Sequence, residues 1–386
     1  MTGLPAPPPS FIPSKRPRIP MPRIRPFRIA AAFKLHDPDA PEVSARLVGE
    51  GSLDGLQVYV RGPLQPADIR ALDAYAALET GLVVHAPHHQ DGVNPVEPTA
   101  PGDLSPDEGK ARLEAGMTAT LEAADRLEAE WIVAHTGCLV RRNPAEGLEA
   151  MSAFLDTWSD PRLILENLPA IGRDVSFTGT SAGDLLALGG GRVSGFCLDL
   201  AHLYVAANHF GWDYPVALAA FDHLPVVYQH LSNSPRGSPR DRHTPLDSPD
   251  GGVPFEHAIA WIAVHPQNTT CLEYKTAGGG VYDAQLAAFD ALYRRHAPLD
   301  ARAALRDLQR CPGIGPSMAR DLIELGIRSV DDLRGRDPEE LYAGACEQRG
   351  VAVDRCVLYA FRCAVYFSET SDPDPDLLRW WRWKDR

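Results

Sequence analysis

Nine histidine and carboxylate side chains in the middle of the chain are of the types that bind metal ions. Six of them each end a short apolar run, in the order His85, His135, Glu166, Asp199, His230 and Glu273. His202 follows three residues after Asp199, and the segment Asp241-Arg242-His243 adds the last two. One histidine in such a place is usually a hydrogen-bonded core residue. Six candidate ligands in succession are hard to explain by packing, because carboxylates are rarely buried unless they are paired or bound to a metal.

The composition of this set favours a cluster of several metal ions. Imidazole and carboxylate groups without a thiolate suit zinc, manganese or iron. Nine groups exceed what one tetrahedral ion needs, so they indicate two or three ions that share bridging carboxylates. Such ions lower the pKa of bound water and offset the charge of a phosphate, and phosphodiester hydrolysis needs both effects.

Eight apolar runs alternate with helical stretches and must position these ligands. We expect strands at Phe27–Phe33, Leu56–Val60, Gly81–His85, Trp131–His135, Leu163–Glu166, Gly195–Asp199, Val226–His230 and Thr270–Glu273. Segments such as Glu108–Glu128 and Ala145–Trp158 have helical periodicity. Eight β/α units over about 250 residues predict an α/β fold, a (β/α)₈ TIM barrel, whose strand ends converge on one face where active sites form.

The composition of the whole chain sets wider limits. The chain has 386 residues, a formal net charge of −13 at pH 7 and a hydrophobic share of 44%, which excludes a mostly disordered protein. No apolar run reaches the roughly 18 residues of a membrane-spanning helix, so we expect no membrane partner. The seven cysteines include no CxxC pair, and their odd number argues against a disulfide framework and favours a cytoplasmic location.

Four regions are expected along the chain. Residues 1–26 form a basic, proline-rich arm that we expect to be flexible, either as a solubilising tail or as a segment that contacts phosphates. Residues 27–298 form the barrel, residues 299–368 a small all-α domain, and residues 369–386 a tail. Residues 1–36 carry seven basic and no acidic side chains, so the body of the chain is strongly acidic.

Several short motifs resemble those of endonuclease IV, the zinc-dependent apurinic/apyrimidinic endonuclease family. Gly195-Phe-Cys-Leu-Asp-Leu-Ala-His202 is similar to that family's Gly-x-Cys-x-Asp-Thr-Cys-His element, and Leu163-Ile-Leu-Glu-Asn167 to its Leu-Leu-Glu-Asn strand. Ala134-His-Thr-Gly137, His230-Leu-Ser-Asn233 and Asp241-Arg-His243 match in the same order. The resemblance covers about residues 27–290, and each of the nine ligands has a counterpart in the family.

The resemblance implies a way of dividing the ligands among up to three zinc ions, with manganese as the alternative metal. The first ion takes His85, His135 and Glu166; the second shares Glu166 and takes Asp199, His230 and Glu273; the third takes His202, Asp241 and His243. We assign the catalytic roles to Glu166, Asp199 and Glu273.

The sequence departs from the family after the first ligand. The family usually carries a tyrosine and an aliphatic residue there, which wedge into DNA, whereas this chain has His88 and His89. We expect both histidines to face solvent rather than to bind metal. Arg61, just beyond the second strand, is a candidate DNA contact, with a surface salt bridge as the alternative.

The segment Cys311-Pro-Gly-Ile-Gly-Pro-Ser-Met-Ala-Arg320 resembles a helix-hairpin-helix. The continuation Ser329–Phe367 is similar to the small pathogenicity-locus domain that extends this fold. Gly313 and Gly315 allow a tight turn that exposes amide donors at a helix N-terminus, which suits a phosphate. We predict that these glycines and Arg320 contact DNA; the alternative is a module for protein contacts only.

Nine ligands and a hairpin module on one chain favour a metal-dependent DNA repair endonuclease that hydrolyses phosphodiester bonds at abasic or otherwise damaged sites. UV-damage endonucleases share this barrel and would differ only in the lesion. The main alternative is a sugar or sugar-phosphate isomerase or epimerase, in which Glu166 and Glu273 transfer protons and Lys275 acts nearby. A non-catalytic DNA-binding scaffold is the third interpretation.

Overall fold

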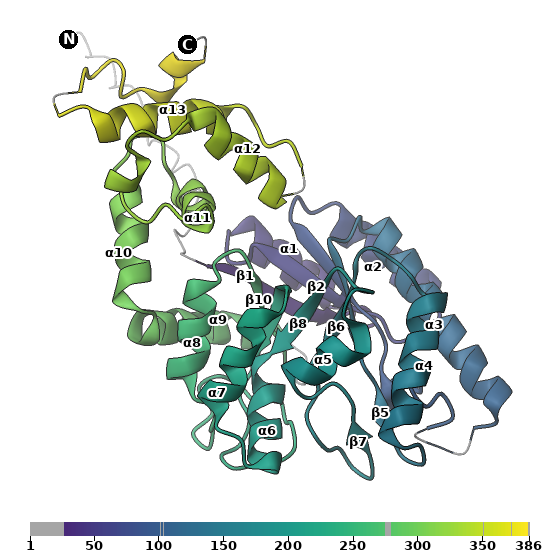
Figure 1. Ribbon diagram of the computed structural model, residues 1–386. Helices are drawn as coiled ribbons and strands as arrows, with labels where there is room; N and C mark the ends of the chain where they lie inside the picture. Colours follow the sequence, from purple (N-terminus) through teal and green to yellow (C-terminus); the bar gives the residue numbers. More distant parts are fainter. Residues whose placement is uncertain are drawn as a thin grey trace, which may run out of the picture.

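The computed structural model describes residues 27–100, 102, 104–274, 279–349, 351–371 and 373–384 (Figure 1). The predicted arm at residues 1–26 and Lys275 lie outside the described residues. Eight parallel strands close into a barrel in the order β1-β10-β9-β8-β6-β4-β3-β2. The strands are β1 (Arg28–Lys34), β2 (Gly55–Tyr59), β3 (Gly81–His85), β4 (Trp131–His135), β6 (Leu163–Glu166), β8 (Gly195–Asp199), β9 (Val226–Leu231) and β10 (Thr269–Leu272). The predicted TIM barrel is confirmed.

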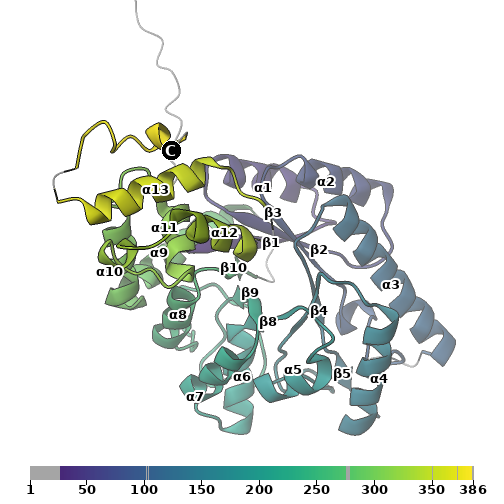
Figure 2. The same cartoon turned by 45° about the horizontal axis from the view of Figure 1, so that its top comes forward.

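Helices connect the strands and surround the barrel (Figure 2). They are α1 (Ala40–Gly49), α2 (Pro66–Ala76), α3 (Pro106–Arg126), α4 (Pro144–Thr157), α5 (Ala182–Gly189), α6 (Leu200–Phe210), α7 (Tyr214–Ala219), α8 (Phe255–Val264) and α9 (Gly279–His296). Several begin at a side-chain cap: Ser105 accepts a hydrogen bond from the backbone N–H of Glu108 at the start of α3, and the side chain of Asn143 caps α4 in the same way. Such caps satisfy amide groups that a helix start leaves unpaired.

Three smaller elements lie in the loops that follow β3, β4 and β6. The short strands β5 (Cys138–Leu139) and β7 (Ser176–Phe177) pair antiparallel, and a 3₁₀ turn, η1 (His89–Asp91), follows β3. These loops all leave the carboxyl ends of barrel strands, so they surround the face on which ligands are expected.

The helical region from α10 onward has its own core. It contains α10 (Leu299–Leu308), α11 (Pro316–Glu324), η3 (Asp331–Leu333), α12 (Pro338–Arg349), α13 (Cys356–Glu369) and η4 (Trp380–Trp383). Leu308, Ile327 and Phe361 are among its buried residues, and Trp380 of the tail packs against them. Arg362 Nη1 also donates a hydrogen bond to the carbonyl of Trp383 at 2.9 Å, so the tail folds back on this region.

The helical region joins the barrel at the amino ends of the strands. Arg320 of α11 donates a hydrogen bond from Nη1 to the carbonyl of Phe27, 2.6 Å away, and Phe27 immediately precedes β1. Burial lowers the pKa of Arg320, and the negative charge of the nearby Asp54, just before β2, partly offsets this by raising it. The candidate ligands stand at the other end of the strands, so the helical region and the ligands lie at opposite ends of the barrel. Figure 1 shows the helical region on the far side of the barrel from β5 and β7, which follow the ligand-bearing ends of β4 and β6.

Candidate metal centre

The pleat of the strands brings the ligands together. Seven buried residues form one layer inside the barrel: Ala30, Val83, Val133, Ile164, Cys197, Tyr228 and Cys271. Side chains two positions apart on a strand share a face, so the residue two places later points inward one layer closer to the open end. On β3, β4, β6, β8 and β9 that residue is a candidate ligand, and just beyond β10 it is Glu273.

Glu166 lies at the centre of this upper layer. Its Oε2 is 3.2 Å from His85 Nε2 and 3.3 Å from His135 Nε2. Its Oε1 is 3.1 Å from His230 Nδ1 and 3.2 Å from His202 Nδ1. The side chain is fully buried. One carboxylate that faces four imidazoles in two directions has the geometry of a bridging ligand.

Two of the ligand groups implied by the resemblance appear as compact sets of donor atoms. His85, His135 and Glu166 form one set, and Glu166, Asp199, His230 and Glu273 form another, with the ligand atoms of each set within 4.8 Å of one another. Glu273 Oε2 is 3.2 Å from His230 Nδ1. The two sets share Glu166, as a pair of ions bridged by one carboxylate requires.

A third set lies beside them, at the start of α6 and on the loop after β9. Asp199, His202 and His243 have ligand atoms within 4.8 Å. Asp241 Oδ2 is 2.8 Å from His243 Nε2 and 3.9 Å from His202 Nε2. Asp199 caps α6, because its Oδ1 accepts a hydrogen bond from the backbone N–H of His202 at 2.7 Å. His243 has a left-handed φ of 42°, a strained conformation that often marks a functional position.

Four of the five histidines of the cluster have, at one ring nitrogen, a protein partner from outside the nine candidate ligands. Their partners are the carbonyl of Ala86 for His85, the carbonyl of Asn167 for His202, Gln57 Oε1 for His230 and Ser232 Oγ for His243, at 2.7 to 3.4 Å. Such partners fix the tautomer and ring orientation of a metal-binding histidine. Gln57 is not among the residues predicted from the sequence, although a polar residue inside the apolar run Leu56–Val60 is a usable signal.

The donor set fits divalent cations. Among the described residues, Asp199 Oδ2 and His135 Nδ1 are buried atoms that have no hydrogen-bond partner. Unpaired buried polar atoms cost free energy, and a bound cation removes that cost for the carboxylate. Imidazoles and carboxylates without a thiolate are the ligands that zinc or manganese would take.

The charges in the cluster depend on one another. Burial opposes ionisation of Glu166, but His230 and His135 beside it hold its pKa well below the usual range. Burial raises the pKa of Asp199. Burial would lower the pKa of His202, yet the neighbouring Asp199 and Glu166 raise it to about 10. Protons therefore balance the carboxylates in the metal-free protein, and a metal ion must displace them.

A pocket of about 800 Å³ opens above the ligands. His135, His202, Asp241 and His243 form part of its wall. Five arginines also line it: Arg61, Arg112, Arg173, Arg240 and Arg242. The candidate ligands therefore lie below a basic rim, although the chain as a whole is acidic.

His88 and His89 belong to this pocket, which corrects the expectation that they face solvent. The side chain of His88 is 18% exposed, and its ring stacks on that of His135, with centroids 4.8 Å apart and planes at 11°. His89 packs edge-on against Phe177 of β7. The prediction failed because β5 and β7 cover this loop, and their pairing links residues too far apart in sequence to be seen as a pattern.

The four predicted DNA contacts have different surroundings. Arg61 stands on the rim with its side chain 60% exposed and its Nε 3.2 Å from Asp91 Oδ1, so it combines a pocket position with the salt bridge. A Cβ added to Gly313 would lie 2.8 Å from Trp380, whereas one added to Gly315 meets nothing within 4 Å. Gly313 thus faces the tail, and Gly315 has open space beside it.

Arg320 requires a correction. It is 9% exposed and bonds to the carbonyl of Phe27, so it holds the helical region on the barrel and is not available to a phosphate. No local pattern indicates this contact, because Phe27 and Arg320 are almost 300 residues apart.

The remaining expectations concern disulfide bonds and membrane-spanning helices. All seven cysteines are free thiols. No helix in the described ranges has the length and apolar character needed to span a membrane.

Comparisons with known proteins place the chain in a family. Residues 50–306 match the xylose isomerase-like TIM barrel family, so the chain belongs to it. Residues 301–386 match a second family, described as a pathogenicity locus, so the helical region is a domain of that type. No curated protein matches the sequence.

Two similar solved structures have the same fold. Endonuclease IV from Thermus thermophilus is 22% identical with a TM-score of 0.51, and the match covers 69% of this chain and 99% of that one. A D-tagatose 3-epimerase-like protein is 17% identical with a TM-score of 0.51, covering 70% and 100%. At these identities the similarity shows the barrel and leaves the reaction to be argued from the site.

Proposed function

We propose that this protein is a metal-dependent phosphodiesterase that cleaves DNA at abasic or otherwise damaged sites and holds up to three zinc ions. The observation that carries the proposal is the third ligand set. Asp199, His202, Asp241 and His243 add a further metal position beside the two that share Glu166. Three cations around one pocket suit a reaction in which negative charge develops on several phosphate oxygens.

The arginine rim supports a polyanionic substrate. Arg240 and Arg242 flank Asp241 in sequence and line the same pocket, so phosphates that approach the third set would meet guanidinium groups first. Arginine donates two parallel hydrogen bonds to a phosphate. A neutral sugar would gain little from five arginines at the entrance.

The ligands have distinct roles in this proposal. Glu166 would bridge the first two ions, Asp199 the second and third, and Glu273 would complete the second. Divalent ions held in this way would supply Lewis-acid chemistry: they activate water near neutral pH and offset the charge of the phosphate. Gln57 would keep His230 in one orientation through the 2.8 Å hydrogen bond between them, and Asn167 would do the same for His202.

The test is the incision of a labelled DNA duplex that carries one abasic-site analogue. Zinc-loaded wild type and Asp241→Ala should be compared, with Asp250→Ala as a matched control, because Asp250 is an exposed aspartate on the same loop. We expect cleavage 5′ to the lesion by the wild type and the control, and a loss of at least about 100-fold for Asp241→Ala, since a direct ligand should matter more than an outer-sphere partner.

Full activity of Asp241→Ala would contradict the three-ion mechanism. A lack of incision by the wild type, while a reference endonuclease cuts in the same buffer, would exclude abasic sites. Duplexes with ultraviolet or oxidative lesions should then be tested.

The competing function is isomerisation or epimerisation of a sugar. Glu166 and Glu273 both approach His230 Nδ1, at 3.1 and 3.2 Å, and such a pair can transfer protons beside one metal ion. That reaction has no use for His202, Asp241 and His243. Conversion of a ketose that Asp241→Ala leaves unchanged would favour this function.

A further inference from the structure

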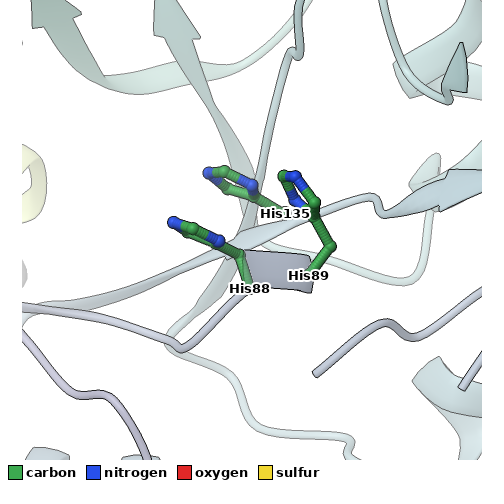
Figure 3. Close-up of side chains that lie close together, drawn as sticks. All are labelled: His88, His89 and His135. Carbon is green, nitrogen blue, oxygen red and sulfur yellow. The ribbon is translucent and has the colours of Figure 1, made fainter. Parts of the chain in front are cut away.

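Three histidines at the side of the pocket form a group that the nine ligands do not explain. The ligand atoms of His88, His89 and His135 lie within 4.8 Å of one another. Figure 3 shows the three rings side by side, with those of His88 and His135 nearly parallel. His88 and His89 come from the loop after β3, and His135 from the end of β4.

His135 differs from the other four histidines of the metal cluster. Its Nε2 faces Glu166 at 3.3 Å, as a ligand of the first ion would. Its Nδ1 is buried and has no hydrogen-bond partner among the described residues, whereas the other four each have a protein group beside the second ring nitrogen. A metal-binding histidine almost always engages its second nitrogen.

We propose that His88, His89 and His135 form an additional metal site, which takes one zinc-like ion and shares only His135 with the nine-ligand cluster. Three imidazoles without a carboxylate favour zinc, nickel or copper and disfavour manganese, which prefers oxygen ligands. Three protein ligands also leave one position of a tetrahedral ion open, and all three histidines line the pocket.

The site is expected to bind more weakly than the cluster. The rings of His88 and His135 are stacked with planes at 11°, so one ion cannot lie in both ring planes as they stand. His88 must turn, and it then gives up the hydrogen bond that its Nδ1 accepts from the backbone N–H of Gln90 at 3.2 Å. The additional site should therefore fill last.

The test counts bound ions as free metal is raised. Metal-free wild type, His88→Gln and His89→Gln are dialysed against defined free zinc or, separately, free manganese, and the ions per chain are measured by elemental mass spectrometry. The matched control is His257→Gln, because His257 is an exposed histidine on α8. Circular dichroism confirms that each variant is folded.

With zinc, we expect wild type and the control to bind one ion per chain more than His88→Gln or His89→Gln, with the difference appearing at the highest free zinc. With manganese, all four proteins should bind the same number. Equal zinc counts in wild type and both variants would overturn the site, as would a loss in only one of them. Asp241→Ala should keep the difference, so failure of the proposed three-ion cluster and failure of this site give separate results.

Discussion

Two buried aspartates, one in each domain, show how differently the protein treats buried charge. Asp321 of the helical domain is 2% exposed, and the guanidinium of Arg349 contacts both of its oxygens at 2.8 Å. Asp199 in the barrel is fully buried, and its Oδ2 has no hydrogen-bond partner among the described residues. Burial raises the pKa of Asp199.

The different partners of Asp321 and Asp199 indicate different roles: the charge of Asp321 stabilises the fold, and we propose that the charge of Asp199 binds metal. A buried carboxylate that faces a guanidinium is neutralised within the protein and contributes to the fold. A buried carboxylate that faces histidines and other carboxylates is balanced by protons, which a metal ion can displace. The charge of Asp321 is therefore neutralised within the helical domain, whereas we propose that the carboxylates in the upper layer of the barrel are neutralised by metal ions.

The largest effect should follow from Glu166→Gln, because Glu166 contacts four of the histidines. We expect phosphodiesterase activity to fall by more than about 100-fold, which is the upper range for loss of an outer-sphere partner, and the zinc content to fall by at least one ion per chain. Activity on the abasic duplex and elemental analysis measure both. Asp321→Asn serves as the control. A loss of zinc from that variant would contradict the claim that only the buried carboxylates of the barrel bind metal.

Arg349→Met should have a large effect on stability and none on metal content. The substitution leaves the buried carboxylate of Asp321 without its guanidinium partner, and a buried polar group left unpaired costs about 1 to 3 kcal/mol. Denaturant unfolding of the helical domain should show this loss. If Arg349→Met is as stable as the wild type, Asp321 is accessible enough to water to need no partner.

Gln57→Leu should weaken zinc binding by about 10- to 100-fold, because Gln57 orients His230 from outside the cluster. Gln229→Leu is the matched control: Gln229 is equally buried, on β9, and it bonds to Thr270 and Trp261 instead. Competition with a fluorescent zinc chelator measures both affinities. Equal affinities for the two variants would show that Gln57 has only a packing role.

The smallest effect, with the opposite sign, is expected from Asp199→Asn without metal. A carboxylate whose pKa is raised on folding lowers stability as pH rises through that pKa, since the folded state binds the proton more tightly. Removing the charge should therefore stabilise the metal-free protein by about 1 kcal/mol near neutral pH. Thermal unfolding with and without zinc tests this, and a less stable metal-free variant would contradict it.

Much of the barrel could be predicted from local pattern. The expected strands agree with the observed ones to within one residue at most ends, because a buried parallel strand is a continuous apolar run. The candidate ligands could be placed at the rim in the same way, since a polar residue that ends such a run stands at the end of its strand; their binding of metal stays a prediction. The partition of these residues among individual ions remains a prediction.

Other features depended on contacts between residues far apart in sequence. The loop with His88 and His89 reads as exposed, but the pairing of β5 with β7 and the stacking on His135 turn it into the pocket. Arg320 reads as a phosphate contact, but α11 presents it to the carbonyl of Phe27.

The sequence alone determined the barrel, the ligand types and their place at the strand ends, because strand periodicity and the convergence of parallel strands are local rules that repeat along the chain. Only the tertiary structure decided which atoms face each other. Glu166 became the central carboxylate, and the helical domain came to lie at the opposite end of the barrel from the candidate ligands, because barrel closure and domain packing set distances that no local pattern contains.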